Sequence, residues 1–329
     1  MLLTTSLVAL AQAEHIKIQS KFSSDHVIRI KEHQDGDLCN SGSKHYTGLI
    51  DISHKHLFVW FQPIRYNNPD APLAIWLQGG PGGSSIVGSL LEHGSCSFSA
   101  ADNSTVFNKL SWTEEFNMLY ISEPVPVGFS YVDKNETEDV YPSHAWTSAI
   151  DFVASVRLTY EIFTDEHISP DAPLYLSGES YAGRWVPTYA AAILDYNERA
   201  SQSAQIPLQS IMVGNGYTSP KDIYPSHYEV ACFEVGGVPA FLNISQCEAM
   251  EMAVDHCVSL LDACQTTLNE LIYSSATQFC YQSFIDPVAN STTNMHDRTK
   301  KCPNPMGAIP NLNSWRVGSI RMLSLKVLR

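Results

Sequence analysis

The chain has 329 residues, 44% of them hydrophobic, which is enough for one large α/β domain or two domains of ordinary size. Its net charge of −14 and pI near 5.2 argue against nucleic acid or an anionic membrane as a partner, and they suit work in an acidic compartment. Beyond the first residues, no apolar run approaches the ~18 residues of a membrane-spanning helix, so we expect a soluble product without a membrane span.

The first 13 residues, MLLTTSLVALAQA, form a short apolar run that ends in an A-x-A pattern. This pattern is typical of a signal peptide, although the run lacks a positive charge and a buried N-terminal strand is the alternative. Four N-x-S/T sequons favour the secretory pathway, and they begin at Asn103, Asn135, Asn243 and Asn290. We therefore expect a signal peptide at 1–13 and a glycoprotein that is vacuolar, lysosomal-like or extracellular.

Eight cysteines are more than a cytosolic enzyme of this size usually carries, and five of them lie between Cys232 and Cys280. None forms the C-x-x-C pair of a zinc site. The sequence therefore predicts disulfides in an oxidising compartment and no metal.

Strands and helices are predicted to alternate between residues 45 and 216. Predicted strands cover 45–51, 56–62, 72–77, 117–122, 174–176 and 208–213, and predicted helices cover 86–92, 145–163 and 182–197. This alternation indicates an α/β fold with a mostly parallel sheet. In such a sheet the chemistry lies in loops at the carboxyl ends of strands, where a glycine-rich loop (78–85) and a tight turn (178–183) are found.

The pattern changes after residue 224. From there to residue 302, cysteines, loops and one helical stretch at 246–261 predict a disulfide-rich cap inserted into the fold. The tail 303–329 has four basic residues and no acidic one, and is interpreted as a segment foreign to the fold, with a basic amphipathic helix as the alternative. Residues 14–329 would then form a single domain that carries the cap.

The turn GESYAG at 178–183 places Ser180 between a buried strand and a helix. A serine at such a turn is a nucleophile elbow, in which the small residues Gly178 and Ala182 let strand and helix approach closely. The N-terminus of the following helix favours negative charge that develops at the hydroxyl. An ordinary turn is the alternative, but the flanking strand and helix favour a nucleophile.

Four motifs in order resemble the serine carboxypeptidases: WLQGGPGGSS at 76–85, EPVPVGFSY at 123–131, GESYAG at 178–183 and GNG at 214–216. The resemblance runs from about residue 45 to 302, and the stretch from 232 is most similar to the carboxypeptidase Y branch. It implies an α/β-hydrolase fold, and release of single residues from peptide C-termini at acidic pH through an acyl-enzyme.

The resemblance also implies seven site residues: Ser180 as nucleophile, Gly80 and Tyr181 as oxyanion donors, and Gln78, Gly79, Glu92 and Glu179 as ligands of the substrate's terminal carboxylate. No cofactor is implied. Two carboxylic acids can face a carboxylate only when they carry protons, which requires raised pKa values or acidic pH. For Glu92 the alternative is a solvated helix end.

The chain departs from the family pattern at two of these motif positions. Gln78 stands where the family has asparagine, so we expect weaker recognition of the terminal carboxylate. Gly83 stands where many members have cysteine, so one long-range disulfide is expected to be absent. The pairs Cys232–Cys247 and Cys257–Cys280 match bridges of the family. This leaves Cys39 and Cys96 for each other, or for Cys264 and Cys302.

The largest departure concerns the catalytic triad, whose order in this fold is Ser, Asp, His. The family places the aspartate and a G-H-x-x-P histidine near its C-terminus, and no such motif follows Ser180. The later histidines end no predicted strand: His227, His256 and His296. The later aspartates are expected in turns (Asp222, Asp286, Asp297) or helical stretches (Asp195, Asp255, Asp262). We therefore expect the last strands and the triad Asp and His to be missing, and the chain to be inactive, because losing a triad costs about 10⁶ in turnover.

Three functions remain open at this point. The first is a serine carboxypeptidase that acts on peptides or proteins with a free C-terminus, with this chain as an incomplete form. The second is a non-catalytic secreted protein that binds peptide C-termini, for which binding would survive Ser180→Ala unchanged. The third is an acyltransferase with the same nucleophile, which would use an amine or alcohol instead of water.

Overall fold

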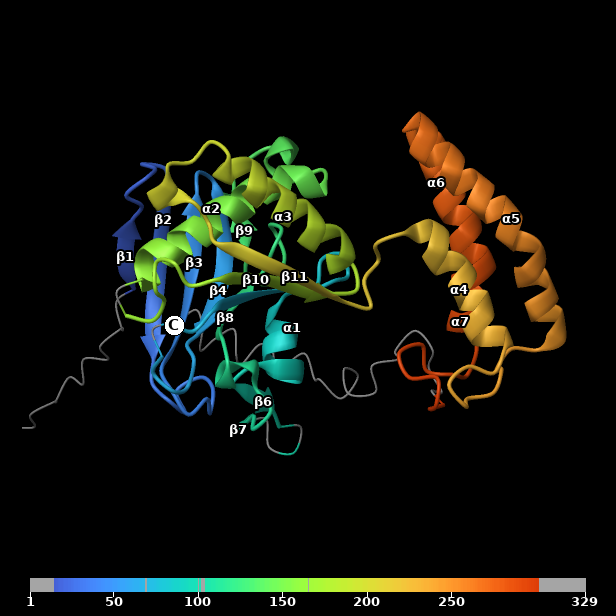
Figure 1. Ribbon diagram of the computed structural model, residues 1–329, viewed down its shortest axis with the longest axis horizontal. Coiled ribbons are helices and arrows are strands. Elements are labelled where there is room, and N and C mark those ends of the chain that lie inside the picture. Colours follow the sequence, from blue (N-terminus) through green and yellow to red (C-terminus); the bar gives the residue numbers. More distant parts are fainter. Residues whose placement is uncertain (1–14, 69, 100, 102–103, 165, 302–329) are drawn as a thin grey trace, which may run out of the picture. The chain divides into compact units, whose positions relative to one another are not determined.

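A computed structural model describes residues 15–68, 70–99, 101, 104–164 and 166–301 (Figure 1). These residues fall into two compact units, which we call unit 1 (up to Gly216) and unit 2 (from Tyr217). The predicted signal peptide, the tail 303–329, Asn103 and Cys302 lie outside the described residues. No helix in the described ranges combines the length and the apolar character needed to cross a membrane.

Unit 1 is built on a nine-stranded sheet in the order β1-β2-β3-β4-β8-β5-β10-β11, with β9 paired to β4. The strands are β1 (Ile16–Gln19), β2 (His26–His33), β3 (His45–Ile52), β4 (Lys55–Gln62), β5 (Leu73–Leu77), β8 (Asn117–Ile121), β9 (Tyr131–Val132), β10 (Leu174–Glu179) and β11 (Leu208–Gly214). The neighbours β8, β5, β10 and β11 are parallel, and β1 to β4 are antiparallel. A separate pair consists of β6 (Cys96–Phe98) and β7 (Thr105–Phe107).

Both faces of the central strands are buried, which explains why they read as continuous apolar runs. In β5, Leu73, Ile75 and Leu77 belong to one hydrophobic cluster, and Ala74 and Trp76 belong to another on the opposite face. The first cluster includes side chains of α2 (Ala145–Phe163) and α3 (Ala182–Asn197), which contact each other and cover this face (Figure 1). The α/β-hydrolase type of sheet predicted from the sequence is therefore observed.

The predicted elements of unit 1 agree closely with the observed ones, with three corrections. Strand β10 continues to Glu179 instead of ending at 176, because β5 pairs with it as far as Gly178 and β11 pairs with it as far as Glu179. Strands β1, β2, β6, β7 and β9 were not predicted. The predicted helix 86–92 is a single turn, α1 (Ile86–Gly88), followed by a π-helical turn (Ser89–His93).

Unit 2 is largely helical, whereas one helical stretch among loops was expected. It contains α4 (Pro220–Cys232), α5 (Ile244–Thr267), α6 (Glu270–Cys280), a π-helical turn (Tyr281–Ile285) and α7 (Asp286–Ala289). Proline at the start of α4 and the Asn269 cap of α6 mark helix starts that were read as loops. For the same reason Asp222 and Asp286, expected in turns, lie in the first turns of α4 and α7.

Three disulfides join cysteines in the described residues. The pairs Cys232–Cys247 and Cys257–Cys280, implied by the family resemblance, are confirmed in unit 2. In unit 1, Cys39 pairs with Cys96, one of the alternatives left open. Cys264 forms no disulfide within the described ranges.

Among the described residues, strand β11 pairs only with β10 and so forms one edge of the sheet. Its residues are partly or fully exposed, and the Ile211 side chain is 43% accessible. This strand contrasts with β5 and β8, in which every residue is buried.

Candidate active site

The candidate site lies where β5 and β10 end side by side. These parallel neighbours are in register, with Leu77 opposite Gly178. The next residues along the two strands are therefore Gln78 and Glu179, so the sheet itself places these two polar side chains at adjacent positions. This is the edge of the sheet at which the sequence predicted the chemistry.

Ser180 occupies a sharp turn between β10 and α3. Its φ of 58° lies in the left-handed region, which residues other than glycine rarely adopt. The turn is held by hydrogen bonds from the Ser180 N–H to the Gly214 carbonyl oxygen (3.0 Å) and from the Gly183 N–H to the Ser180 carbonyl oxygen (3.0 Å). A Cβ on Gly178 would lie 2.6 Å from the Cβ of Ala182, so small residues are required where strand and helix meet.

The glycine-rich loop packs directly against this turn. A Cβ on Gly79 would lie 2.6 Å from both the Cβ of Ser180 and the backbone nitrogen of Tyr181, so only glycine fits. The loop then folds back on itself through a hydrogen bond from the Gly83 N–H to the Gly79 carbonyl oxygen (2.9 Å), with Gly80 at a φ of 119°. The predicted oxyanion donors, Gly80 and Tyr181, are therefore carried by two segments in contact.

Gln78, Glu179 and Glu92 form a polar cluster beside Ser180. The Gln78 side-chain nitrogen donates to Oε1 of Glu179 at 2.6 Å. The pKa of Glu92 is raised to about 7, first by burial and then by the nearby Glu179 carboxylate, while the Gln78 amide opposes this in part. The Glu92 side chain is 30% exposed and lies in the π-helical turn, so it is not a fully solvated helix end.

Three further residues hold this cluster in place: Trp76, Ser85 and Gly88. The sequence analysis did not predict them as site residues. The indole Nε1 of Trp76 donates to Oε1 of Gln78 at 2.9 Å, and the backbone N–H of Gln78 donates to Oγ of Ser85 at 3.2 Å. A Cβ on Gly88 would approach Nε1 of Trp76 to 2.4 Å, so glycine makes room for the indole. The sequence pattern does not predict these contacts, because they depend on how the glycine-rich loop folds back on the end of β5.

The EPVPVGFSY motif supports the glycine-rich loop from the end of β8. Oγ of Ser84 lies 2.7 Å from Oγ of Ser122, and Gly128 packs against both hydroxyls. Ser130 donates to the Ser122 carbonyl oxygen at 2.5 Å and accepts from the Phe58 N–H at 2.8 Å. This motif therefore has a structural role in fixing the loop.

No histidine hydrogen-bonds to the Ser180 hydroxyl in the described part of unit 1. His93 stacks on Trp112, and its Nδ1 lies 3.0 Å from the Tyr120 hydroxyl. His227 and His256 lie in α4 and α5 of unit 2, and His296 lies in the loop after α7, so none of them ends a strand, as predicted. Among the residues that the structure describes, no group of three or more His, Cys, Asp or Glu side chains is arranged to hold a metal ion.

Comparison with known proteins identifies the family. The profile of the serine carboxypeptidase family matches residues 37–318. Carboxypeptidase Y homolog A of Ajellomyces capsulatus (strain NAm1 / WU24) is 33% identical over 294 residues, which are 89% of this chain and 51% of the relative. The homolog A of Paracoccidioides brasiliensis (strain Pb18) is 32% identical over 91% of this chain and 52% of its own length.

A solved structure supports the same fold. The crystal structure of Kex1(delta)p, a prohormone-processing carboxypeptidase from Saccharomyces cerevisiae, superimposes with a TM-score of 0.59 at 22% identity, covering 91% of this chain and 61% of that one. The chain spans about half the length of the curated relatives that it matches. On the family match over most of its length, the chain belongs to the serine carboxypeptidase family.

Proposed function

We propose that this chain carries the nucleophile and the carboxylate-binding part of a serine-type carboxypeptidase site. The observation that supports this most directly is the cluster of Gln78, Glu179 and Glu92 beside the Ser180 turn. A protonated Glu92 can donate a hydrogen bond to the terminal carboxylate of a peptide, and the Gln78 amide holds Glu179 in place. Recognition of a free C-terminus is then strongest at acidic pH.

The scissile bond would lie between the cluster and the glycine-rich loop. Ser180 Oγ attacks the carbonyl carbon, and the backbone N–H groups of Gly80 and Tyr181 stabilise the oxyanion. The C-terminal residue leaves as an amine, and water then hydrolyses the acyl-enzyme on Ser180. One oxyanion donor of this kind typically contributes about 3 kcal/mol.

This reaction needs a base for the Ser180 proton, and the described part of unit 1 supplies no histidine for it. We therefore propose that the 329-residue chain alone binds peptide C-termini with little or no turnover. This is the non-catalytic alternative raised by the sequence, and the intact carboxylate cluster is the observation that favours it. For an acyltransferase, no feature of the site favours an amine or alcohol over water.

The proposal extends to domain organisation and destination. Residues 14–329 would form one hydrolase domain with a cap at about 224–302, which includes most of unit 2. A secretory destination, vacuolar or extracellular, is supported by the three disulfides and by the exposure of three sequon asparagines: Asn135, Asn243 and Asn290. Its partners would be peptides or proteins with a free C-terminus.

The test compares binding with turnover in one preparation. The full chain, made in an oxidising secretory host, is titrated at pH 5 with an N-blocked dipeptide and with the C-terminal amide of the same dipeptide, in parallel with Ser180→Ala. We expect the free acid to bind wild type and Ser180→Ala equally, the amide to bind at least tenfold more weakly, and no residue to be released.

Two results would count against the proposal. Equal binding of the free acid and the amide would show that the chain does not recognise a terminal carboxylate. Release of the C-terminal residue by the wild type but not by Ser180→Ala would show that the chain holds a working base, and would restore an active carboxypeptidase.

A further inference from the structure

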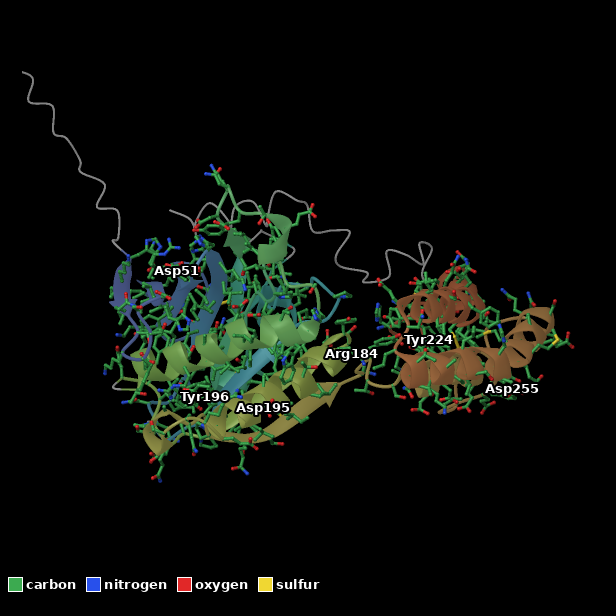
Figure 2. The ribbon with its side chains drawn as sticks, turned by 90° about the horizontal axis from the view of Figure 1, so that it is seen from above. Asp51, Arg184, Asp195, Tyr196, Tyr224 and Asp255 are labelled. Atoms are coloured by element: carbon green, nitrogen blue, oxygen red, sulfur yellow. A yellow bond between two sulfur atoms is a disulfide. The ribbon has the colours of Figure 1, made fainter. Side chains whose placement is uncertain are left out.

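A cavity of about 520 Å³ opens on the helical side of unit 1, and none of the candidate site residues lines it. Its walls are the outer side of α2, the C-terminal half of α3, and the loop between β1 and β2. Asp195 and Tyr196, labelled in Figure 2, belong to the α3 wall. The volume is in the range of small-molecule binding sites.

The floor of this cavity is an exposed apolar stripe on α2. Trp146 and Ile150, one turn apart, are 48% and 68% accessible, and Val153 and Ala154 continue the stripe. Large apolar side chains that stay this exposed along a lined cavity favour an apolar ligand, because covering them removes hydrocarbon surface from water.

The loop wall is fixed to α2 by hydrogen bonds. Oγ of Ser20 lies 3.1 Å from Oε2 of Glu161, and the Lys21 N–H donates to the same carboxylate at 2.9 Å. The Gln19 side chain also donates to the carbonyl oxygens of Ser23 and His26 at 2.9 and 2.8 Å. The loop therefore forms a fixed wall of the cavity. Its hydrogen bonds engage the carboxylate of Glu161.

Arg157 is left without an anionic partner as a result. Glu161, one helical turn away, would be its usual ion-pair partner. In the described residues, however, no carboxylate lies within ion-pairing distance of the Arg157 guanidinium, and its buried Nε has no hydrogen-bond partner. The guanidinium lies 4.8 Å from the centre of the Phe22 ring, on the cavity side of the loop. Two other charged residues line the cavity, Asp195 in α3 and Arg199 just after it, and both are exposed and carry opposite charges.

We infer that this cavity binds an amphipathic carboxylate of the fatty-acid class. The alkyl chain would cover Trp146 and Ile150, and the carboxylate would pair with the Arg157 guanidinium, whose buried Nε has no hydrogen-bond partner. A neutral amphiphile of the same length would cover the same apolar surface but leave Arg157 unpaired. Charge-assisted hydrogen bonds to arginine are strong enough to discriminate between the two by about tenfold or more.

Calorimetric titration with two probes of equal chain length tests this inference. Sodium dodecanoate and dodecan-1-ol are titrated, below the micellar range, into the full chain and into Arg157→Met and Arg184→Met. Arg184 is an exposed arginine at the start of α3 that does not line the cavity (Figure 2). We expect dodecanoate to bind the wild type and Arg184→Met at least tenfold more tightly than dodecan-1-ol, and Arg157→Met to bind both equally.

A second variant tests the apolar stripe on α2. Ile150→Asp, on an exposed position that leaves the core intact, adds a negative charge to the cavity and should weaken dodecanoate binding at least tenfold. Absence of dodecanoate binding to the wild type would overturn the inference. It would equally be overturned if dodecanoate bound to Arg157→Met as tightly as to the wild type, which would place the fatty acid elsewhere, such as at the Gln78 cluster.

Discussion

The side-chain amide of Gln78 bridges two residues from different parts of the sheet, accepting from Trp76 and donating to Glu179 at 2.6 Å. The family resemblance implies asparagine at this position, and an asparagine side chain is one methylene shorter. Gln78 therefore reaches across the ends of β5 and β10 and fixes Glu179 before any ligand arrives. We propose that this fixed arrangement offsets part of the weaker carboxylate recognition expected from the sequence.

Gln78→Ala removes both ends of this bridge. It leaves the buried Nε1 of Trp76 unsatisfied, so we expect the free energy of unfolding to fall by about 1–3 kcal/mol. Urea unfolding followed by tryptophan fluorescence measures this, because five of the six tryptophans belong to unit 1, and the sixth, Trp315, lies outside the described residues. The matched control, Gln202→Ala on an exposed residue, should change stability by less than about 0.5 kcal/mol. Equal effects of the two substitutions would mean that the bridge does not stabilise the site.

Glu92 should make unit 1 less stable as the pH rises. Its pKa is raised from 4.5 to about 7 in the folded state, first by burial, so the folded protein holds this proton more tightly than the unfolded chain does. The contribution of Glu92 is therefore complete below pH 4.5 and lost as the pH rises to about 7. When the pH is raised from 4.5 to 7.5, the urea midpoint of unfolding should fall less for Glu92→Gln than for the wild type. A control on an exposed residue, Glu115→Gln, should match the wild type.

His45 should make unit 1 less stable as the pH falls, which is the opposite of the effect of Glu92. This histidine is fully buried and stacked on His33 (ring centres 5.2 Å apart), and burial lowers its pKa from 6.5 to about 4. Its contribution to stability is therefore complete above pH 6.5 and declines as the pH falls toward 4. When the pH is lowered from 7.5 to 4.5, we expect the free energy of unfolding to fall by about 2 kcal/mol less for His45→Phe than for the wild type. If the exposed control His54→Phe has the same effect, the change does not come from burial.

The backbone at Ser180 predicts an unusual order of stabilities. Because a positive φ favours glycine, Ser180→Gly should be more stable than Ser180→Ala by about 1 kcal/mol. At Ser210 in β11 the order should reverse, since glycine weakens an ordinary strand. Chemical denaturation of the four variants measures both differences. Equal stability of the two Ser180 variants would show that the turn relaxes when its side chain is changed.

The disulfides of the two units should act separately. Cys39 and Cys96 close a loop with a sequence separation of 57, so replacing both by alanine should lower the stability of unit 1 by about 2–4 kcal/mol. Replacing Cys232 and Cys247, in unit 2, should leave the tryptophan transition unchanged. A similar loss from both double variants would mean that the two units unfold together.

Much of unit 1 could be predicted because local pattern and tertiary structure agree there. The helices α2 and α3 begin and end where their apolar spacing does. The runs that became β5 and β8 are apolar because both faces of the sheet are covered. The position of the candidate site followed from the same pattern, since its motifs come directly after buried strands.

Features that depend on contacts between distant residues could not be predicted. The π-helical turn that carries Glu92, the Gln78–Glu179 hydrogen bond and the space that Gly88 leaves for Trp76 all arise where segments meet. In unit 2, α5 confirms the helical stretch predicted at 246–261, whereas the other helices escaped prediction. The buried positions of α6 are Ala276 and Cys280, which give a weak apolar period.

The exposed edge of β11 affects how this molecule behaves in concentrated solution. The strand LQSIMVG has no charged residue and no proline, and these are the devices that usually prevent edge-to-edge pairing between copies. Within the part of the chain that the structure describes, the N–H and C=O groups on the outer side of β11 pair with no strand, and they therefore offer a template for aggregation. We expect the shelf life of the folded protein to depend on its concentration more than on its thermal stability.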